Sequence, residues 1–190
     1  ALQCALPELD PEAEYTLVLL GDVPLVQPET IERLLTAAGD GMAILTTVLR
    51  NPTGYGRILR QKGRIVAIVE QKDATEGQKQ IREVNTGIML LPTARLQGWL
   101  SELKTSNAQG EYYLTDVIAM ARQAGLPIAT TSVTDPLEVE GANNRAQLAA
   151  LERGFQQRAA HELMMAGVTL RDPARFDLRG SLRCGQDVVV

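Results

Sequence analysis

The sequence predicts an α/β fold built on a sheet with parallel strands. The first observation behind this prediction is the apolar run from Tyr15 to Leu20, which ends at Gly21-Asp22. An unbroken apolar run is typical of a strand that is buried on both faces of a parallel sheet. The second observation is that a helical pattern (residues 29–38) and another apolar run (residues 42–49) follow. Strand, helix and strand in this order indicate a crossover unit.

Turn residues and apolar periodicity predict the elements that follow. Pro28 opens the first helix, and Gly39 supplies its stop signal. Residues 57–60 and 64–70 flank a turn at Gln61-Lys62-Gly63. In the second segment, Ile65, Ala67 and Val69 alternate with Val66 and Ile68, which predicts a β-hairpin. The later elements are a strand over residues 84–91, a helix from Pro92 through Leu103, a helix from about Tyr112 to Ala124 and a strand from Pro127 to Val133.

A long helix is predicted from Asn144 to Ala166, with a change of pattern after it. Its apolar residues are three or four positions apart and form one narrow stripe, which suits a helix that lies along a single neighbour and connects two domains. Beyond Gly167, short apolar segments alternate with turns and are too short to bury a core of their own. We therefore predict a domain boundary within the helix, near residue 150. The stripe consists of Leu148, Leu151, Phe155, Ala159 and Leu163.

Composition excludes several classes of protein. The 190 residues are 45% hydrophobic and 22% charged, which is close to the average of globular proteins and excludes wholesale disorder. No apolar run approaches the roughly 20 residues that cross a bilayer. The formal charge is −4, and no long basic stretch offers a surface for nucleic acid. Cys4 and Cys184 lie near opposite ends and form neither a disulfide framework nor a metal knuckle, so a cytoplasmic setting is expected.

Three features of the sequence each have both a functional and a structural explanation. Asp22 follows a buried strand, where a carboxylate can hold Mg²⁺ together with a substrate phosphate or can cap a turn. Gly54 and Gly56 let the backbone approach sugar hydroxyls, or they form the turn that leads into the hairpin. Asn85 interrupts an apolar strand, and its amide must find partners in a ligand or in a neighbouring loop.

The remaining polar clusters also have a structural explanation beside a functional one. Glu70 ends a strand, where its carboxylate can bind a pair of hydroxyls or remain solvated. Residues 110–116 place hydroxyls and carboxylates at a helix start, which suits a phosphate or simply begins the helix. Residues 138–145 precede the long helix and include Asn143 and Asn144, either of which can be its N-cap. The single histidine, His161, is a surface residue, and no Walker loop, zinc pattern or nucleophile elbow occurs.

Six sequence blocks and a tail, taken together and in order, resemble one family of enzymes. The family is the bacterial bifunctional N-acetylglucosamine-1-phosphate uridyltransferase / glucosamine-1-phosphate N-acetyltransferase, and the resemblance covers the whole chain. The blocks are residues 20–25 (Leu-Gly-Asp-Val-Pro-Leu), 51–58 (Asn-Pro-Thr-Gly-Tyr-Gly-Arg-Ile), 70–74 (Glu-Gln-Lys-Asp-Ala), 83–88 (Glu-Val-Asn-Thr-Gly-Ile), 109–116 (Gln-Gly-Glu-Tyr-Tyr-Leu-Thr-Asp) and 138–145 (Glu-Val-Glu-Gly-Ala-Asn-Asn-Arg), and the tail is residues 166–180.

This resemblance implies three structural parts and a reaction. The parts are a Rossmann-like nucleotidyltransferase domain over residues 1–145, a linker helix over residues 146–166 and the start of a left-handed β-helix over residues 167–190. The implied reaction joins UTP and N-acetylglucosamine 1-phosphate into UDP-N-acetylglucosamine and pyrophosphate, for peptidoglycan and lipopolysaccharide precursors. The family also acetylates glucosamine 1-phosphate, and the β-helix implies a homotrimer of the full-length protein.

The resemblance also implies roles for the residues that contact the metal and the nucleotide. Asp22 and Asn143 would bind Mg²⁺, with a carboxylate oxygen and a neutral amide oxygen. Leu20 and Gly21 would join Asp22 in contacting the nucleotide sugar, and Asn143 would also touch the product. No catalytic residue in the sense of a protein nucleophile is expected, because transfer to the α-phosphorus requires mainly alignment and charge neutralisation.

The other implied residues contact the sugar phosphate. Gly56, Glu70 and Asn85 would hold the sugar. Tyr113 and Thr115 would lie near the sugar phosphate. All five belong to the blocks that carry the resemblance.

The sequence also departs from the family pattern. Family members begin with a strand and a Gly-rich loop bearing Arg and Lys, which cradles the triphosphate, and further on a Gln and a Gly-Thr pair read the uracil. We expect the chain to start just after these elements and to stop before the acetyltransferase site. We therefore expect the 190-residue chain alone to be inactive, and robust synthesis of UDP-N-acetylglucosamine by it would contradict this. Two other functions stay open: a non-catalytic module that binds sugar and oligomerises, and a pyrophosphorylase for another sugar phosphate.

Overall fold

The protein is described by a computed structural model of residues 1–190, which contains two compact units. The first unit comprises Ala1–Gly21 and Val26–Val139, and the second comprises Asp22–Leu25 and Glu140–Val190. No helix has both the length and the apolar character needed to cross a membrane. The domain boundaries predicted at residues 145 and 166 stay predictions.

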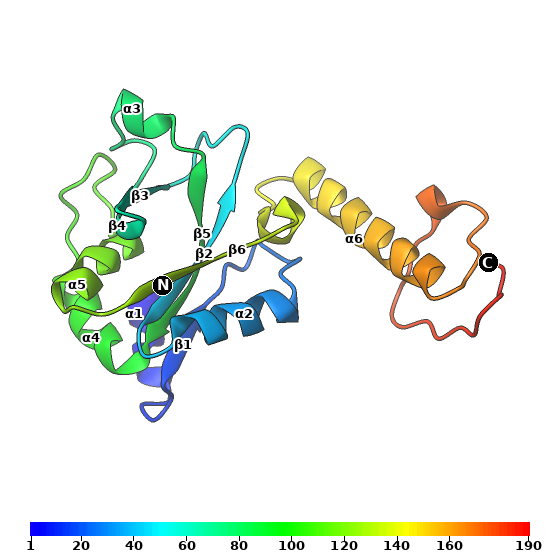
Figure 1. The fold of residues 1–190 in the computed structure, drawn as a ribbon, viewed down its shortest axis with the longest axis horizontal. Helices are drawn as coiled ribbons and strands as arrows, with labels where there is room; N and C mark the ends of the chain where they lie inside the picture. Colours follow the sequence, from blue (N-terminus) through cyan, green and yellow to red (C-terminus); the bar gives the residue numbers. More distant parts are fainter. The chain divides into compact units, whose positions relative to one another are not determined.

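The first unit is built on a six-stranded mixed sheet (Figure 1). Five strands follow the order β4-β3-β5-β2-β6, and β1 pairs with β5. Strand β5 is antiparallel to β1, β2 and β3, whereas β2 and β6 are parallel. The strands are β1 (Tyr15–Val18), β2 (Met42–Val48), β3 (Arg57–Gln61), β4 (Arg64–Val69), β5 (Glu83–Pro92) and β6 (Ile128–Ser132).

Helices of the first unit connect and cover these strands. Because β1 and β2 are both antiparallel to β5, they point the same way, and α2 joins them as the predicted crossover. The α-helices are α1 (Leu2–Ala5), α2 (Pro28–Ala38), α3 (Glu76–Lys79), α4 (Thr93–Glu102) and α5 (Val117–Gln123), and the 3-10 helices are η1 (Leu6–Glu8), η2 (Leu114–Asp116) and η3 (Pro136–Val139).

The centre of the sheet is covered on both faces. Met42 and Ile44 of β2 belong to the core cluster that also contains residues of α4 and α5. Ala43 and Leu45 alternate with them and are equally inaccessible, so they point to the other face, against which α2 packs. The predicted α/β architecture is therefore confirmed, but the sheet is mixed, because β5 runs antiparallel to its three partners.

Strand β1 differs from its prediction. The expected strand over residues 15–20, buried on both faces, ends at Val18, and its four residues are only half-buried. Leu19 and Leu20 are 52% and 39% exposed. The physical reason is that β1 pairs with β5 alone, so its other edge has no strand to complete its burial.

The hairpin is confirmed, whereas the helix predicted from Tyr112 is shorter than expected. Lys62 and Gly63 connect β3 and β4 with φ angles of 51° and 78°, the two positive values of a type I′ turn. Residues Tyr112 and Tyr113 precede η2 and are not helical. Helical structure begins only after Tyr113, because the backbone of that residue is extended, with φ −91° and ψ 115°.

The second unit contains the long helix α6 (Arg145–Met165). Asn144 is its N-cap, since its side chain accepts a hydrogen bond from the Gln147 amide at 2.9 Å. The predicted single packed stripe is wrong in part: Leu151 and Ala159 are buried, but Leu148 and Phe155 are 55% and 42% exposed. Nothing in this unit covers these two apolar side chains.

Gln156, which lies off that stripe, is buried instead. Its Nε2 donates to the Leu178 carbonyl at 3.1 Å, and its Oε1 accepts from the Leu178 amide at 2.6 Å. One side chain therefore satisfies both backbone groups of Leu178 and holds the segment after α6 against the helix.

The segment after α6 contains η4 (Pro173–Arg175) and one parallel bridge. Thr169 donates its amide to the Val188 carbonyl at 2.8 Å and accepts from the Val190 amide at 2.9 Å. Val168 and Leu170 pack with Ala160 of α6 in a small apolar cluster. A parallel bridge is compatible with a β-helix coil, but the left-handed β-helix and the linker role of α6 stay predictions.

Candidate functional site

The predicted sugar-binding residues Gly56 and Glu70 are neighbours at the open end of the β3–β4 hairpin. A Cβ atom built on Gly56 would lie 3.1 Å from Glu70 Oε1 and 3.2 Å from Oε2. Thr115 of η2 donates its hydroxyl to Glu70 Oε1 at 3.2 Å. The structure therefore brings Gly56, Glu70 and Thr115 together, and a bare glycine backbone faces the carboxylate.

The Glu70 carboxylate lies in an unusual electrostatic environment. Burial is the main cause that raises the pKa of Glu70, while the hydrogen bond from Thr115 lowers it. The charges of Asp73 and Asp116 raise the pKa of Glu70 further, and Arg57 opposes them. Oε2 makes no hydrogen bond within the chain, so this oxygen is free to accept one from a ligand hydroxyl.

Asn85 lies beside Gly56 in β5. Its backbone amide donates to the Gly56 carbonyl at 2.9 Å, and its side-chain Oδ1 accepts from the Gly87 backbone amide at 3.1 Å. Nδ2 makes no hydrogen bond within the chain, although the residue is half-buried. The side-chain oxygen of Asn85 therefore has a partner in its own strand, whereas its NH₂ group is a donor without an acceptor.

Leu20 reaches the same region through Gly87. A Cβ atom built on Gly87 would lie 2.7 Å from Leu20 Cδ1, and Gly87 has a φ of +85°. Glycine is required there both by the backbone conformation and by the close approach of Leu20. Gly21, in contrast, is exposed, and a Cβ atom added to it would meet nothing within 4 Å.

Tyr113 has a different set of partners. Its hydroxyl donates to Asp73 Oδ2 at 3.1 Å and accepts from Gln109 Nε2 at 2.9 Å. Asp73 Oδ1 in turn accepts from the Ala108 amide at 2.9 Å. Tyr113 therefore fastens the loop over residues 107–113 to Asp73, and no hydrogen bond joins it to Glu70.

The predicted metal ligands Asp22 and Asn143 belong to the second unit. The Asp22 carbonyl accepts from the Ala142 amide at 2.9 Å, and a Cβ atom built on Gly141 would lie 3.1 Å from Asp22 Oδ2. Both Asp22 and Asn143 are exposed. Glycine at position 141 leaves the carboxylate accessible, and carboxylate and amide oxygens are the hard donors that Mg²⁺ prefers, so the residues fit such an ion.

The protein supplies few ligands to that ion. No group of three or more His, Cys, Asp or Glu side chains is arranged to hold a metal. Mg²⁺ is commonly bound by one or two protein oxygens, with water and substrate phosphates completing its shell. The pair Asp22 and Asn143 is consistent with that second kind of site.

Two further residues of this region were not predicted. Arg57 is only 1% exposed and donates Nη2 to Gln71 Oε1 at 2.5 Å and Nη1 to the Tyr55 carbonyl. Gln71 Oε1 also accepts from the Gly54 amide at 3.2 Å. These bonds tie the glycine turn to the loop that begins at Glu70. Both residues lie in the sequence blocks quoted above, but a sequence pattern cannot reveal a contact between positions that are so far apart.

Solved structures share the fold of this chain. A protein from Bacillus anthracis described as a glucose-1-phosphate thymidylyltransferase superposes with a TM-score of 0.56 at 20% identity, covering 79% of this chain and 57% of that one. A CMP:2-keto-3-deoxy-manno-octonic acid synthetase in complex with CTP superposes with a TM-score of 0.55 at 18% identity, covering 83% and 67%. The chain therefore shares the mixed α/β, Rossmann-like fold of these structures.

Sequence comparison gives a closer relationship. No protein-family profile matches the chain. The bifunctional protein GlmU of Paraburkholderia phymatum is 55% identical over 192 residues, that of Pseudomonas putida 56% and that of Stutzerimonas stutzeri 57%. Each alignment covers 100% of this chain and 42% of the relative, so the chain spans about two fifths of their length. The resemblance carried by the six blocks is confirmed: over its whole length, the chain is similar to part of the bifunctional GlmU proteins.

Proposed function

We propose that the chain carries the sugar-binding part of a uridyltransferase that makes UDP-N-acetylglucosamine and pyrophosphate from UTP and N-acetylglucosamine 1-phosphate. The observation that supports this most is the group formed by Gly56, Glu70 and Asn85, with Thr115 behind Glu70. A carboxylate facing a bare glycine backbone is suited to a polyhydroxylated ring, because it accepts from hydroxyls that a side chain at position 56 would displace.

The free polar atoms of this group match the groups of a sugar. Glu70 Oε2 accepts from a ring hydroxyl, and Asn85 Nδ2 donates to a sugar oxygen. Arg57 and Gln71 keep the glycine turn and the Glu70 loop in register, so both acceptor and donor are held before the ligand arrives. Such preorganisation lowers the entropy lost on binding.

Asp22 and Asn143 would hold Mg²⁺, which neutralises negative charge on the substrate phosphates when it is bound. The chain's own residues need only orient the sugar phosphate, since its phosphate oxygen is itself the nucleophile toward the α-phosphorus. Leu20 and Gly21 would contact the nucleotide sugar, and Tyr113 and Thr115 would support the region near the sugar phosphate. No side chain has to form a covalent intermediate.

The remaining properties of the family are also proposals for this protein. They are acetylation of glucosamine 1-phosphate by the full-length protein, a homotrimer formed through the β-helix, a cytoplasmic setting, and a supply of peptidoglycan and lipopolysaccharide precursors. Their only support in the 190 residues is the GlmU relationship and the parallel bridge between Thr169 and Val189.

The proposed function is tested by calorimetric titration of the 190-residue chain with UDP-N-acetylglucosamine and with UDP-glucose, in Mg²⁺. We expect UDP-N-acetylglucosamine to bind more tightly, and Glu70→Gln to weaken it about 10-fold, because a hydrogen bond to a charged acceptor is lost. The exposed Glu102 offers a matched control, since Glu102→Gln makes the same charge change on α4. Equal binding of both nucleotide sugars, or equal effects of the two variants, would contradict the proposal.

A further inference from the structure

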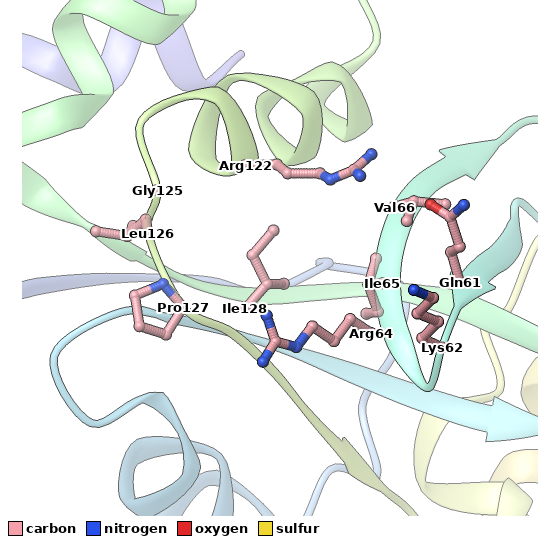
Figure 2. A pocket seen from close by; sticks show the side chains of 10 residues that line it. All are labelled: Gln61, Lys62, Arg64, Ile65, Val66, Arg122, Gly125, Leu126, Pro127 and Ile128. Atoms are coloured by element: carbon pink, nitrogen blue, oxygen red, sulfur yellow. The ribbon is translucent and has the colours of Figure 1, made fainter.

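A cleft with a volume of about 850 Å³ lies in the first unit (Figure 2). The turn and first residues of β4 form one wall, and the end of α5 with the start of β6 forms the other. The volume falls within the range of small-molecule sites. Apolar side chains line part of it: Ile65, Val66, Leu126 and Ile128.

The charged groups of this cleft all have one sign. Lys62, Arg64 and Arg122 line it, and no Asp or Glu is among its lining residues. Figure 2 shows Arg122 extending from α5 toward the hairpin and Arg64 extending from the hairpin toward the start of β6. The chain as a whole carries a formal charge of −4, so three cations without a carboxylate are a local concentration of positive charge.

These three cations have no partner within the chain, unlike a neighbouring arginine. Arg60 on the same hairpin donates to both carboxylate oxygens of Glu83, at 2.8 and 2.6 Å, and to Thr130 at 3.0 Å. Lys62, Arg64 and Arg122 make no side-chain hydrogen bond or ion pair. Their hydrogen-bond donors are therefore available to an anion, and guanidinium groups suit phosphate oxygens.

The cleft is separate from the candidate sugar site. Glu70 follows the last residue of β4, whereas Arg64 is its first, and a six-residue strand is about 20 Å long. Thr115, which contacts Glu70, precedes α5, whereas Arg122 lies in the last turn of that helix. Two elements thus have one end at the cleft and the other at Glu70.

We propose that this cleft is a binding site for a small organic phosphate, one whose anionic group is bound by Lys62, Arg64 and Arg122 while a flat or apolar body rests on Ile65 and Ile128. A single inorganic phosphate would fill only a small part of the volume and would leave the apolar wall uncovered. The combination of charge and apolar surface therefore selects a ligand with both parts. The site is independent of the nucleotidyltransferase reaction proposed above.

The probe is adenosine 5′-monophosphate, compared with adenosine and with inorganic phosphate, in titrations of the 190-residue chain followed by backbone amide shifts. We expect adenosine monophosphate to bind more tightly than either part alone, to shift amides at residues 62–66 and 125–128, and to weaken as salt rises. Arg122→Gln and Arg64→Gln should each weaken it about 3- to 10-fold, as loss of a partly exposed charged contact does.

Arg95→Gln is the matched control, because Arg95 is an exposed arginine on α4 that does not line the cleft. Lys62→Gln, in the exposed turn, serves if an arginine variant unfolds, as judged by circular dichroism. The proposal is overturned if adenosine monophosphate binds no better than phosphate and adenosine, if its shifts fall around Glu70, or if Arg95→Gln weakens it as much as the cleft variants do.

Discussion

Replacing Gly56 by alanine is the most informative single change at the candidate sugar site. The added methyl carbon would lie 2.9 Å from Ile68 Cγ2 and 3.1 and 3.2 Å from the two Glu70 oxygens. Carbon atoms in good contact are about 3.5–4.0 Å apart, so both neighbours must move by several tenths of an ångström. The backbone of Gly56 does not have a positive φ, so the effect is one of space alone.

The size of the effect follows from these contacts. Overpacking a tightly packed site costs about 1–3 kcal/mol of stability. The displaced carboxylate also loses its alignment with a bound sugar, which we expect to weaken UDP-N-acetylglucosamine about 10-fold or more, since hydrogen bonds to a charged acceptor contribute about 1.5–3 kcal/mol. Urea unfolding measures the stability loss, and calorimetric titration measures the affinity.

Gly98 provides the matched control. It lies in α4, has no positive φ, and an added Cβ atom would meet nothing within 4 Å. Gly98→Ala should therefore raise the free energy of unfolding by about 0.5–1 kcal/mol, as alanine does in a helix interior, and leave affinity unchanged. If Gly56→Ala bound the nucleotide sugar as tightly as the unmodified chain while Gly98→Ala behaved as expected, the steric reasoning would be refuted.

Three further changes follow from the structure. Burial raises the pKa of Glu70 above its ordinary value of 4.5. The free-energy penalty of its ionised form is therefore absent below pH 4.5 and develops as the pH rises through the raised pKa. Glu70→Gln should be more stable than the unmodified chain at pH 7, by a margin that shrinks toward pH 4 in urea titrations. Arg57→Lys keeps the charge but loses the two-pronged geometry, and we expect a loss of about 1–3 kcal/mol in the same assay, with no loss counting against the role of Arg57. Gln156→Ala frees both backbone groups of Leu178, so hydrogen exchange at that amide should accelerate while α6 stays protected, and unchanged exchange would exclude this anchor.

Local chemistry made part of this structure predictable. Lys62-Gly63 suits a tight hairpin turn, and Asn144 before an apolar repeat suits an N-cap; both depend on neighbours within a few residues. The burial of β1 was overestimated because an apolar run indicates only that a strand is suited to burial. The number of strands beside it depends on the whole sheet. The predicted packing of Leu148 and Phe155 in α6 was wrong for a similar reason, because it depends on which neighbours the folded chain provides.

The candidate site was predictable by resemblance more than by pattern. Gly56, Glu70 and Asn85 each looked like an ordinary turn, strand end or buried amide, and only the fold brings them together. Arg57 and Gln71 were not predicted because a buried arginine is rare, and the sequence does not indicate which distant oxygen accepts a hydrogen bond from it. The cations of the cleft come from the β3–β4 turn, β4 and α5, and only the folded structure shows that they line the same cleft.

Whether this chain binds a sugar phosphate through the Gly56–Glu70–Asn85 group is tested most directly by titrating it with N-acetylglucosamine 1-phosphate and following every backbone amide by NMR. Saturable shifts should concentrate at residues 54–56, 70–71 and 85–87, and Glu70→Gln should reduce the affinity while Glu102→Gln does not. Absence of saturable shifts, or shifts confined to residues 62–66 and 125–128, would contradict the proposed sugar site.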